Sequence, residues 1–394
     1  MSNKRETIVF QTERLEQQEI SEMIELLLQW YDKNRRILPW REEPSPYRVW
    51  VSEIMLQQTR VEAGREYFER FMKELPDIES LANVEDEKLM KLWEGLGYYN
   101  RARNLKKAAG IVIEKFSGRM PSAYAQLLEL PGIGPYTAGA IASIAFGEAV
   151  PAVDGNVLRV LSRITADHRD ITASSVKKSM QSKLQEIIPR KRTGDFNQAL
   201  MELGALVCIP NGAPKCTECP VNEFCIALKK NLTAVLPFKK QKKPRKIERK
   251  TMLIMKLNGE MALRKRPDTG LLAGFLELPS IPQNLEKEQV ELCLSRMGFA
   301  YTSINPLGEA KHIFSHVEWR MKGYEIELIK LPEKSQERNN LFCLEDSSEP
   351  DFCMKGLDDL IWVKGEILRE KIALPSAFKP YENAFPKREE EGGE

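Results

Sequence analysis

Four cysteines gather on one short stretch with the spacing C-x7-C-x2-C-x5-C, namely Cys208, Cys216, Cys219 and Cys225. Four thiolates on one loop can hold tetrahedral zinc or a [4Fe-4S] cluster, and the chemistry alone does not separate the two. Zinc ribbons usually pair two C-x2-C knuckles, whereas this stretch has one, so the spacing favours the iron–sulfur cluster. The three remaining cysteines are scattered and are expected in the core or on the surface.

Two carboxylates stand in contrasting surroundings. Glu53 lies within an apolar run, where burial keeps a carboxyl protonated to higher pH, and on a helix it shares a face with Gln57. Asp154 stands where a helix N-cap belongs, and amide donors with the helix dipole are expected to hold it ionised. A proton donor and an anion are what N-glycosidic cleavage requires. The simpler alternatives are that Glu53 pairs with Arg41 or Arg48 and that Asp154 only caps a helix.

A glycine hairpin precedes a helix of small residues. Gly132 and Gly134 lie in the segment LPGIGPYTA at 130–138. Glycines leave the backbone amides unobstructed, and amides at a helix N-terminus can hold a phosphate without reading base sequence. The segment predicts the hairpin of a helix-hairpin-helix DNA-binding element.

The elements that must position these residues fall into two domains. Helical apolar periodicity runs to about residue 230, which predicts an all-α domain over 1–230 with roughly ten helices and the cysteine loop at 208–225. A basic linker follows at 231–250. From 251 to 378 the pattern predicts an α+β domain: a hairpin turning at Asn258-Gly259, one helix over 285–297, and strands around 308–330 and 360–363. The tail at 379–394 is expected to be disordered.

Composition bounds the function classes. Hydrophobic residues make up 42% and charged residues 29%, which excludes a disordered or fibrous chain. The net charge is only +2, yet eight basic residues and one acidic residue lie between Lys239 and Lys250, so any contact with a polyanion is local. The N-terminal residues lack an apolar signal core, which predicts a cytoplasmic protein in a reducing compartment without disulfides, and no segment is long enough to predict a membrane span.

Six motifs together resemble the adenine DNA glycosylase family, MutY: LPWR at 38–41, SEIMLQQT at 52–59, GLGYY at 95–99, the glycine hairpin, VDGNV at 153–157 and the cysteine loop. The resemblance implies a helical, [4Fe-4S]-containing enzyme of the endonuclease III-like superfamily, followed by a Nudix-like domain. It implies a monomeric bacterial enzyme that acts at the nucleoid on double-stranded DNA and removes adenine mispaired with 8-oxoguanine or guanine. Such an enzyme must flip the target nucleotide out of the stack.

The resemblance also assigns roles to particular residues. Glu53 would protonate adenine, and Asp154 would stabilise or trap the sugar cation, with support from Tyr136 and Asn156. The flipped base would lie in a pocket, and the duplex would be contacted by wedging residues and by the hairpin glycines. The pocket residues implied are Trp40, Arg41 and Gln198, and the DNA contacts are Gln57, Gln58, Tyr98, Gly132 and Gly134.

The second domain carries Phe314-Ser315-His316, which the resemblance assigns to 8-oxoguanine recognition. One alternative is a pyrimidine glycosylase-lyase of endonuclease III type, but it would carry a lysine where Tyr136 stands, and a phenol cannot form an imine. Another is a noncatalytic DNA-binding iron–sulfur protein, against which the two carboxylates count. A third is a nucleotide pyrophosphohydrolase, but the chain lacks the G-x5-E-x7-R-E-x-x-E-E sequence whose carboxylates bind magnesium.

Overall fold

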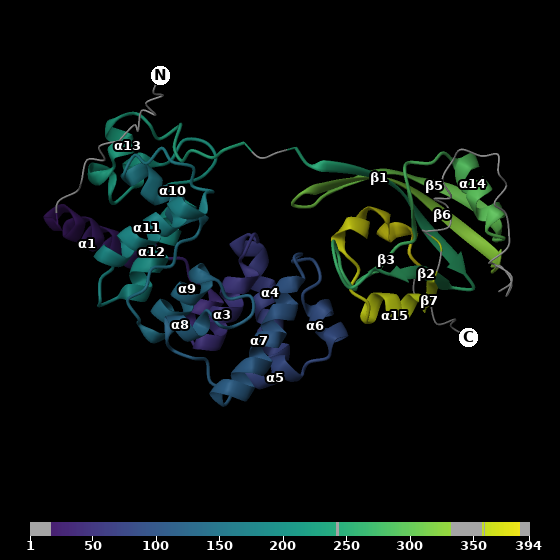
Figure 1. The fold of residues 1–394 in the computed structure, drawn as a ribbon, viewed down its shortest axis with the longest axis horizontal. Helices are drawn as coiled ribbons and strands as arrows, with labels where there is room; N and C mark the ends of the chain where they lie inside the picture. The colour runs from purple at the N-terminus through teal and green to yellow at the C-terminus, as the bar shows by residue number, and fades with distance from the viewer. Residues whose placement is uncertain (1–16, 242–243, 332–356, 358, 387–394) are drawn as a thin grey trace, which may run out of the picture. The chain divides into compact units, whose positions relative to one another are not determined.

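The computed structural model describes residues 17–241, 244–331, 357 and 359–386. The chain divides into two compact units, one of Met1–Val84 with Asn100–Lys242 and the other of Glu85–Tyr99 with Lys243–Glu394. Figure 1 shows helices in the purple and teal parts of the chain and the sheet in the green and yellow parts. Among the described residues, no helix combines the length and apolar character needed to cross a membrane.

The first unit is all-α, as the apolar periodicity predicts. Its helices are α1 (Gln17–Asn34), α2 (Pro39–Glu42), α3 (Pro46–Met55), α4 (Val61–Glu74), α5 (Ile78–Asn83), α7 (Asn100–Phe116), α8 (Tyr124–Leu127), α9 (Pro135–Phe146), α10 (Gly155–Ile164), α11 (Ser174–Ile187), α12 (Thr193–Leu206) and α13 (Ile226–Lys229), with 3-10 turns η1 (Cys216–Glu218) and η2 (Asn222–Phe224). The predicted helix-hairpin-helix is α8, the glycine turn and α9.

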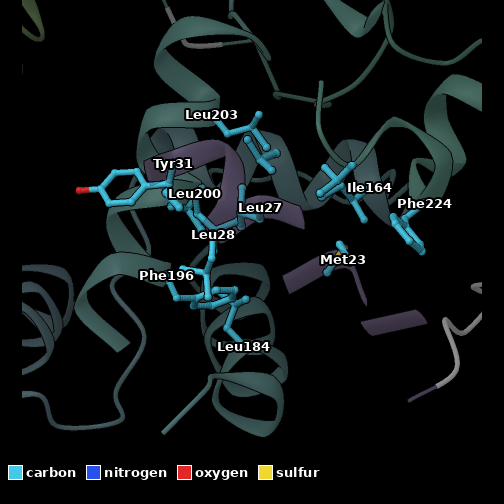
Figure 2. Close-up of a cluster of buried hydrophobic side chains, with 14 of the residues drawn as sticks. Met23, Leu27, Leu28, Tyr31, Ile164, Leu184, Phe196, Leu200, Leu203 and Phe224 are labelled. Carbon is cyan, nitrogen blue, oxygen red and sulfur yellow. The ribbon is translucent and has the colours of Figure 1, made fainter. Parts of the chain in front are cut away.

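One apolar cluster joins the two ends of this unit's sequence. Leu27, Leu28 and Tyr31 recur at helical spacing on α1 and are buried against Leu200 and Leu203 of α12. Figure 2 shows these side chains gathered between the helices. Burying side chains of this size contributes on the order of 1.5–3 kcal/mol each. The cluster therefore fixes α12, which carries much of the site described below.

Small residues on α9 allow close helix packing. A Cβ at Gly139 would lie 2.5 Å from the carbonyl oxygen of Pro151, so only glycine fits where the chain passes over the helix on its way to Asp154. From α12, Asn197 accepts from the amide of Ala152 at 3.0 Å and donates to the carbonyl of Val150 at 2.9 Å. The segment before α10 is therefore held from two sides.

The second unit contains a mixed sheet in the order β3-β2-β1-β6-β5, with β4 paired to β1 and β7 to β2. β1 runs parallel to β6, and the other pairs are antiparallel. The elements are α6 (Asp86–Leu92), β1 (Lys246–Leu257), β2 (Glu260–Lys265), β3 (Leu276–Glu277), β4 (Ser280–Pro282), α14 (Lys287–Arg296), β5 (Ala300–Ile313), β6 (Val317–Lys330), β7 (Leu360–Lys364), α15 (Gly365–Glu370) and η4 (Ser376–Ala384).

Alternation along β1 gives the sheet two buried faces. Leu253 and Met255 face a cluster that includes α14, whereas Met252 and Ile254 face a cluster that includes α15 and η4. The hairpin predicted at Asn258-Gly259 is confirmed, since both residues have positive φ and the register pairs Leu257 with Glu260. The helix predicted over 285–297 is confirmed as α14.

Three predictions about this part of the chain are corrected. The strand β1 begins at Lys246, inside the segment predicted as linker, because β6 pairs with its basic first residues. The tail predicted over 379–394 is ordered in its first part, since Tyr381 and Ala384 of η4 are buried, while 387–394 lie outside the described residues. Cys293 is buried in α14, as expected, but is disulfide-bonded, against the expectation of reduced cysteines.

Candidate active site of the helical unit

A cavity of about 650 Å³ opens where α2, α3, α9, α12 and the start of α10 meet. It brings together nearly all the residues predicted for base excision in this unit, although they are distant in sequence. The predicted residues that line it are Trp40, Arg41, Glu53, Gln57, Gln58, Tyr136, Asp154, Asn156 and Gln198. A cavity that brings two carboxyl groups together is a candidate catalytic site.

Glu53 lies in the last turns of α3 and is 9% exposed. Burial is the largest influence on its carboxyl and raises its pKa to about 7, although the Tyr136 hydroxyl donates to Oε2 and Arg41 also favours the charged form. The predicted upward shift of the Glu53 pKa is therefore confirmed. Neither suggested arginine pairs with it: Arg41 binds Glu202, and Arg48 donates to the carbonyl of Pro39. Gln57 lies beyond the end of α3 but lines the same cavity.

Asp154 is the N-cap of α10, as predicted. Its Oδ1 accepts from the amide of Val157 at 2.7 Å, and its Oδ2 accepts from Asn156 Nδ2 at 2.8 Å. The prediction that this cap lowers the pKa is wrong in its net direction, because burial raises the pKa and outweighs the donors and Arg159. Both carboxyl groups are thus shifted upward. Asp154 nevertheless has several donors where Glu53 has only Tyr136, so Glu53 is the better-placed group to hold the proton.

Asn156 is held in turn by Arg159, which is 5% exposed. Arg159 Nη2 donates to Asn156 Oδ1 at 2.9 Å and to the carbonyl of Gly204 at 2.7 Å. Arg159 Nε donates to the carbonyl of Cys208 at 2.7 Å. Because Arg159 binds the oxygen of the Asn156 side-chain amide, the nitrogen Nδ2 stays directed at Asp154.

Gly204 allows α12 to approach Asn156. A Cβ there would lie 2.6 Å from Asn156 Cβ, closer than real contacts allow. We expect Gly204→Ala to displace Asn156, to lower the excision rate, and to destabilise the fold by about 1–3 kcal/mol, the usual range for overpacking. Gly110→Ala on the exposed face of α7 has no atom within 4 Å and is the matched control. Single-turnover rates and melting temperatures check this, and equal behaviour of the two variants would contradict it.

The pocket walls include a residue that sequence reasoning missed. Glu202 on α12 is 1% exposed and binds Arg36 and Arg41, whose guanidinium groups also line the cavity. Trp40 is buried and meets Phe68 edge to face at 5.3 Å. The signal for Glu202 was a single charge inside an otherwise apolar helical run, which is unfavourable unless the charge is paired.

The glycine hairpin has the geometry expected for a phosphate site. Gly132 has φ +79°, and a Cβ there would lie 2.8 Å from Asn104 Cβ. Gly134 is the N-cap of α9, which has no side-chain cap, so its first amides are available to an anion. The predicted wedge residues Gln58 and Tyr98 also have positive φ, at 61° and 47°. A positive φ costs free energy at residues other than glycine, and this backbone conformation recurs at functional sites.

In the second unit, Phe314-Ser315-His316 forms the turn between β5 and β6. The amide of Phe314 donates to the carbonyl of Val317 at 2.8 Å, and its ring packs edge to face on Trp319 with centroids 4.8 Å apart. Tyr98 belongs to this unit, and its hydroxyl lies 3.2 Å from Ser315 Oγ. The turn is thus held rigidly at its first residue and hydrogen-bonded at its second.

The four cysteines of the loop line one small cavity, together with Arg163, whose Nη1 lies 3.2 Å from Cys208 Sγ. Burial raises the pKa of the Cys219 thiol to about 12, so a centre that binds this residue as a thiolate must compensate for the cost of its buried charge. Within the described residues, no group of three or more His, Cys, Asp or Glu is arranged to hold a single metal ion. The four sulfurs that line this cavity are the donor set that an iron–sulfur cluster uses.

Both halves of the chain match known families. Residues 51–186 match the HhH-GPD superfamily of base excision DNA repair proteins, and residues 250–384 match the NUDIX domain. Among solved structures, the chain is similar to a trapped endonuclease III–DNA covalent intermediate, at 25% identity and TM-score 0.48, covering 56% of this chain and all (100%) of that one. A thermostable thymine-DNA glycosylase is similar at 28% identity and TM-score 0.48, covering 54% and 98%. The family match of residues 51–186, together with the relatives described next, makes this a DNA glycosylase of the helix-hairpin-helix class.

Similar proteins of known function identify the family within this class of DNA glycosylases. Adenine DNA glycosylase of Mus musculus is 36% identical over 364 residues, which cover 78% of this chain and 70% of the relative. Adenine DNA glycosylase of Buchnera aphidicola subsp. Baizongia pistaciae is 37% identical over 295 residues, covering 74% and 82%. The chain belongs to the adenine DNA glycosylase family.

Proposed function

We propose that the enzyme hydrolyses the N-glycosidic bond of adenine mispaired with 8-oxoguanine or guanine in duplex DNA. The observation that carries this proposal is the shared cavity of about 650 Å³ that Glu53, Tyr136 and Asp154 line, which joins a carboxyl group of raised pKa to a second carboxyl group that caps a helix. The adenine specificity is supported by the relatives and by the polar walls of Arg41 and Gln198.

Each residue has one part in the reaction. Protonated Glu53 donates its proton to the ring of the flipped adenine, so the base leaves as a neutral molecule when the bond to the sugar breaks. Asp154 stabilises the oxocarbenium-like sugar that remains, and Asn156 keeps that carboxylate oriented. Water then adds to the sugar carbon and loses a proton to the Glu53 carboxylate, which restores the acid. Tyr136 holds Glu53 and offers no amine, so we expect a monofunctional glycosylase.

The direct test uses a duplex with one A:8-oxoguanine pair. Adenine excision by a monofunctional enzyme leaves an abasic site, so strand breaks should appear only after hot alkali. Breaks without alkali would instead favour the endonuclease III-type glycosylase-lyase. Unchanged DNA under both conditions, with tight binding, would favour the noncatalytic alternative.

Recognition of the opposite base is assigned to Phe314-Ser315-His316. The support for it is a turn whose Phe314 is hydrogen-bonded to Val317 and whose Ser315 hydroxyl lies 3.2 Å from the hydroxyl of Tyr98, a predicted wedge residue. A site built to satisfy polar groups discriminates by leaving them unsatisfied with the wrong partner.

We expect Ser315→Ala combined with His316→Ala to lower the ratio of excision rates for A:8-oxoguanine over A:G by about tenfold, the equivalent of one or two lost hydrogen bonds. Excision from A:G should persist, because the catalytic cavity is unchanged. Thr302→Ala removes an exposed hydroxyl at the far end of β5 and is the matched control. An unchanged ratio in the double variant would place recognition in the helical unit.

The cysteine loop is proposed to bind a [4Fe-4S] cluster through Cys208, Cys216, Cys219 and Cys225. The cluster would supply a rigid cationic centre for the loop, and it takes no part in the bond-breaking steps. We expect the purified protein to be yellow-brown, with about four iron and four sulfide per chain. Elemental analysis of protein made under iron-replete, anaerobic conditions checks this, and stoichiometric zinc would contradict it.

A further inference from the structure

Glu202 forms ion pairs with Arg36 and Arg41 at the wall of the cavity that Glu53 and Asp154 also line. Its Oε1 accepts from Arg36 Nε at 2.7 Å and from the backbone amide of Arg36 at 3.1 Å. Its Oε2 accepts from Arg36 Nη2 and from Arg41 Nη2, each at 3.0 Å. The second guanidinium nitrogen of Arg41 donates to the carbonyl of Arg36 at 3.1 Å. Both terminal nitrogens of the Arg41 guanidinium group, Nη1 and Nη2, are thus held by hydrogen bonds.

A buried carboxylate of this kind is costly unless its partners compensate for lost hydration. Here they do, because the two arginines hold the pKa of Glu202 at about 2 despite burial. The ionised state is therefore constant at all pH values where the enzyme works. Glu202 is not a proton donor, and its contribution must come from geometry and charge.

We propose that Glu202 is a positioning residue of the adenine pocket, which orients the Arg41 guanidinium toward the flipped base and cancels one of the two arginine charges beside Glu53. The inference rests on the proposed function, because it concerns the acid of that reaction. Arg36, Arg41 and Glu202 together carry a net charge of +1. Without Glu202 the same wall would carry +2.

The charge matters because Glu53 must keep its proton to act. The ionisable groups that face it are Tyr136 from α9, Asp154 at the start of α10 and Arg41 from α2, with Lys177 of α11 also on the cavity lining. Tyr136 and Arg41 lower the pKa of Glu53, while burial and Asp154 raise it. An additional uncompensated cation would favour the carboxylate and deplete the acid at neutral pH.

The experiment measures the single-turnover rate of adenine excision from an A:8-oxoguanine duplex as a function of pH. In the wild type, the rate should fall as pH rises through about 7, where Glu53 loses its proton. Glu202→Gln keeps the shape of the side chain and raises the wall charge to +2, so the fall should move to lower pH by about one unit. Arg36→Gln lowers the wall charge to zero, so the fall should move to higher pH.

The double variant Arg36→Gln/Glu202→Gln restores the charge of +1, and its pH profile should return to that of the wild type. A merely structural role predicts the opposite, namely a double variant worse than either single one with no displacement of the profile. Arg35→Gln is the matched control, since this exposed neighbour does not contact Glu202 within the hydrogen bonds and ion pairs of the described residues.

The outcomes separate the two proposals. A wild-type enzyme that does not excise adenine contradicts the proposed function, whatever the variants do. An active wild type whose pH profile is unmoved by Glu202→Gln contradicts the role of Glu202. If Glu202→Gln does not fold, Arg36→Gln decides alone, because Arg36 is partly exposed and its removal must move the profile upward.

Discussion

Replacing Glu53 by Gln is expected to lower the single-turnover rate of adenine excision by about 10²–10⁴-fold, the usual contribution of a positioned general acid. The amide keeps the volume of the carboxyl group and can still accept from Tyr136, but it cannot donate a proton that the leaving base retains. Binding of the duplex should be unchanged, because the contacts proposed for DNA lie on the hairpin and wedge residues.

The control for this variant is Glu69→Gln on the exposed face of α4. A second readout is stability. The pKa of Glu53 is raised from 4.5 to about 7 by burial, so the wild type loses stability as pH rises between those values while the Gln variant does not. The melting temperature of Glu53→Gln should therefore rise relative to that of the wild type as pH increases from 4.5 to about 7, with no further relative change above that range. Near-normal excision would remove Glu53 as the acid.

Asp154→Asn should lower the excision rate by about 10²–10³-fold, because it deletes the negative charge that faces the developing sugar cation. Asparagine is as good an N-cap as aspartate, so α10 should remain intact. The rate and the melting temperature are measured together, and the rate should fall without a fall in the melting temperature, because burial raises the pKa of Asp154 and thus disfavours its charge in the folded state. This separates the charge of Asp154 from its capping role.

Asp77→Asn is the matched control, because Asp77 is also an N-cap and accepts from the amide of Ser80 at 2.8 Å at the exposed start of α5. It should have no effect on excision. If Asp154→Asn retained full activity, Asp154 would be no more than a helix cap.

Residues within one motif were predictable from the sequence, because local rules position them. The N-cap at Asp154, the glycine turn at Gly132 and the β-turn at Asn258-Gly259 all follow from preferences that extend over a few residues. The convergence of Glu53 with Tyr136 and Asp154 came from the family resemblance, since no local pattern states which helices meet.

The electrostatic state of the site was less predictable. The amide donors of Asp154 are local and were foreseen, whereas the burial that outweighs them depends on how segments distant in sequence pack around the cap. Glu202 was missed for a similar reason, because its partners lie far away in sequence on and before α2. The pKa values of Asp154 and Glu202 both depend on contacts between residues distant in sequence, and sequence patterns carry little information about such contacts.

The helix α12, which is 14 residues long, contributes several residues to the site. It supplies Gln198 and Glu202 to the pocket, and Gly204 beneath Asn156. A chimaera that exchanges this helix alone for the equivalent helix of another family member would therefore transplant pocket wall, charge balance and catalytic support as a single module. Within such grafts Gln198 is open to variation for a changed base preference, whereas Gly204 must be kept because Asn156 of the recipient's α10 packs against it.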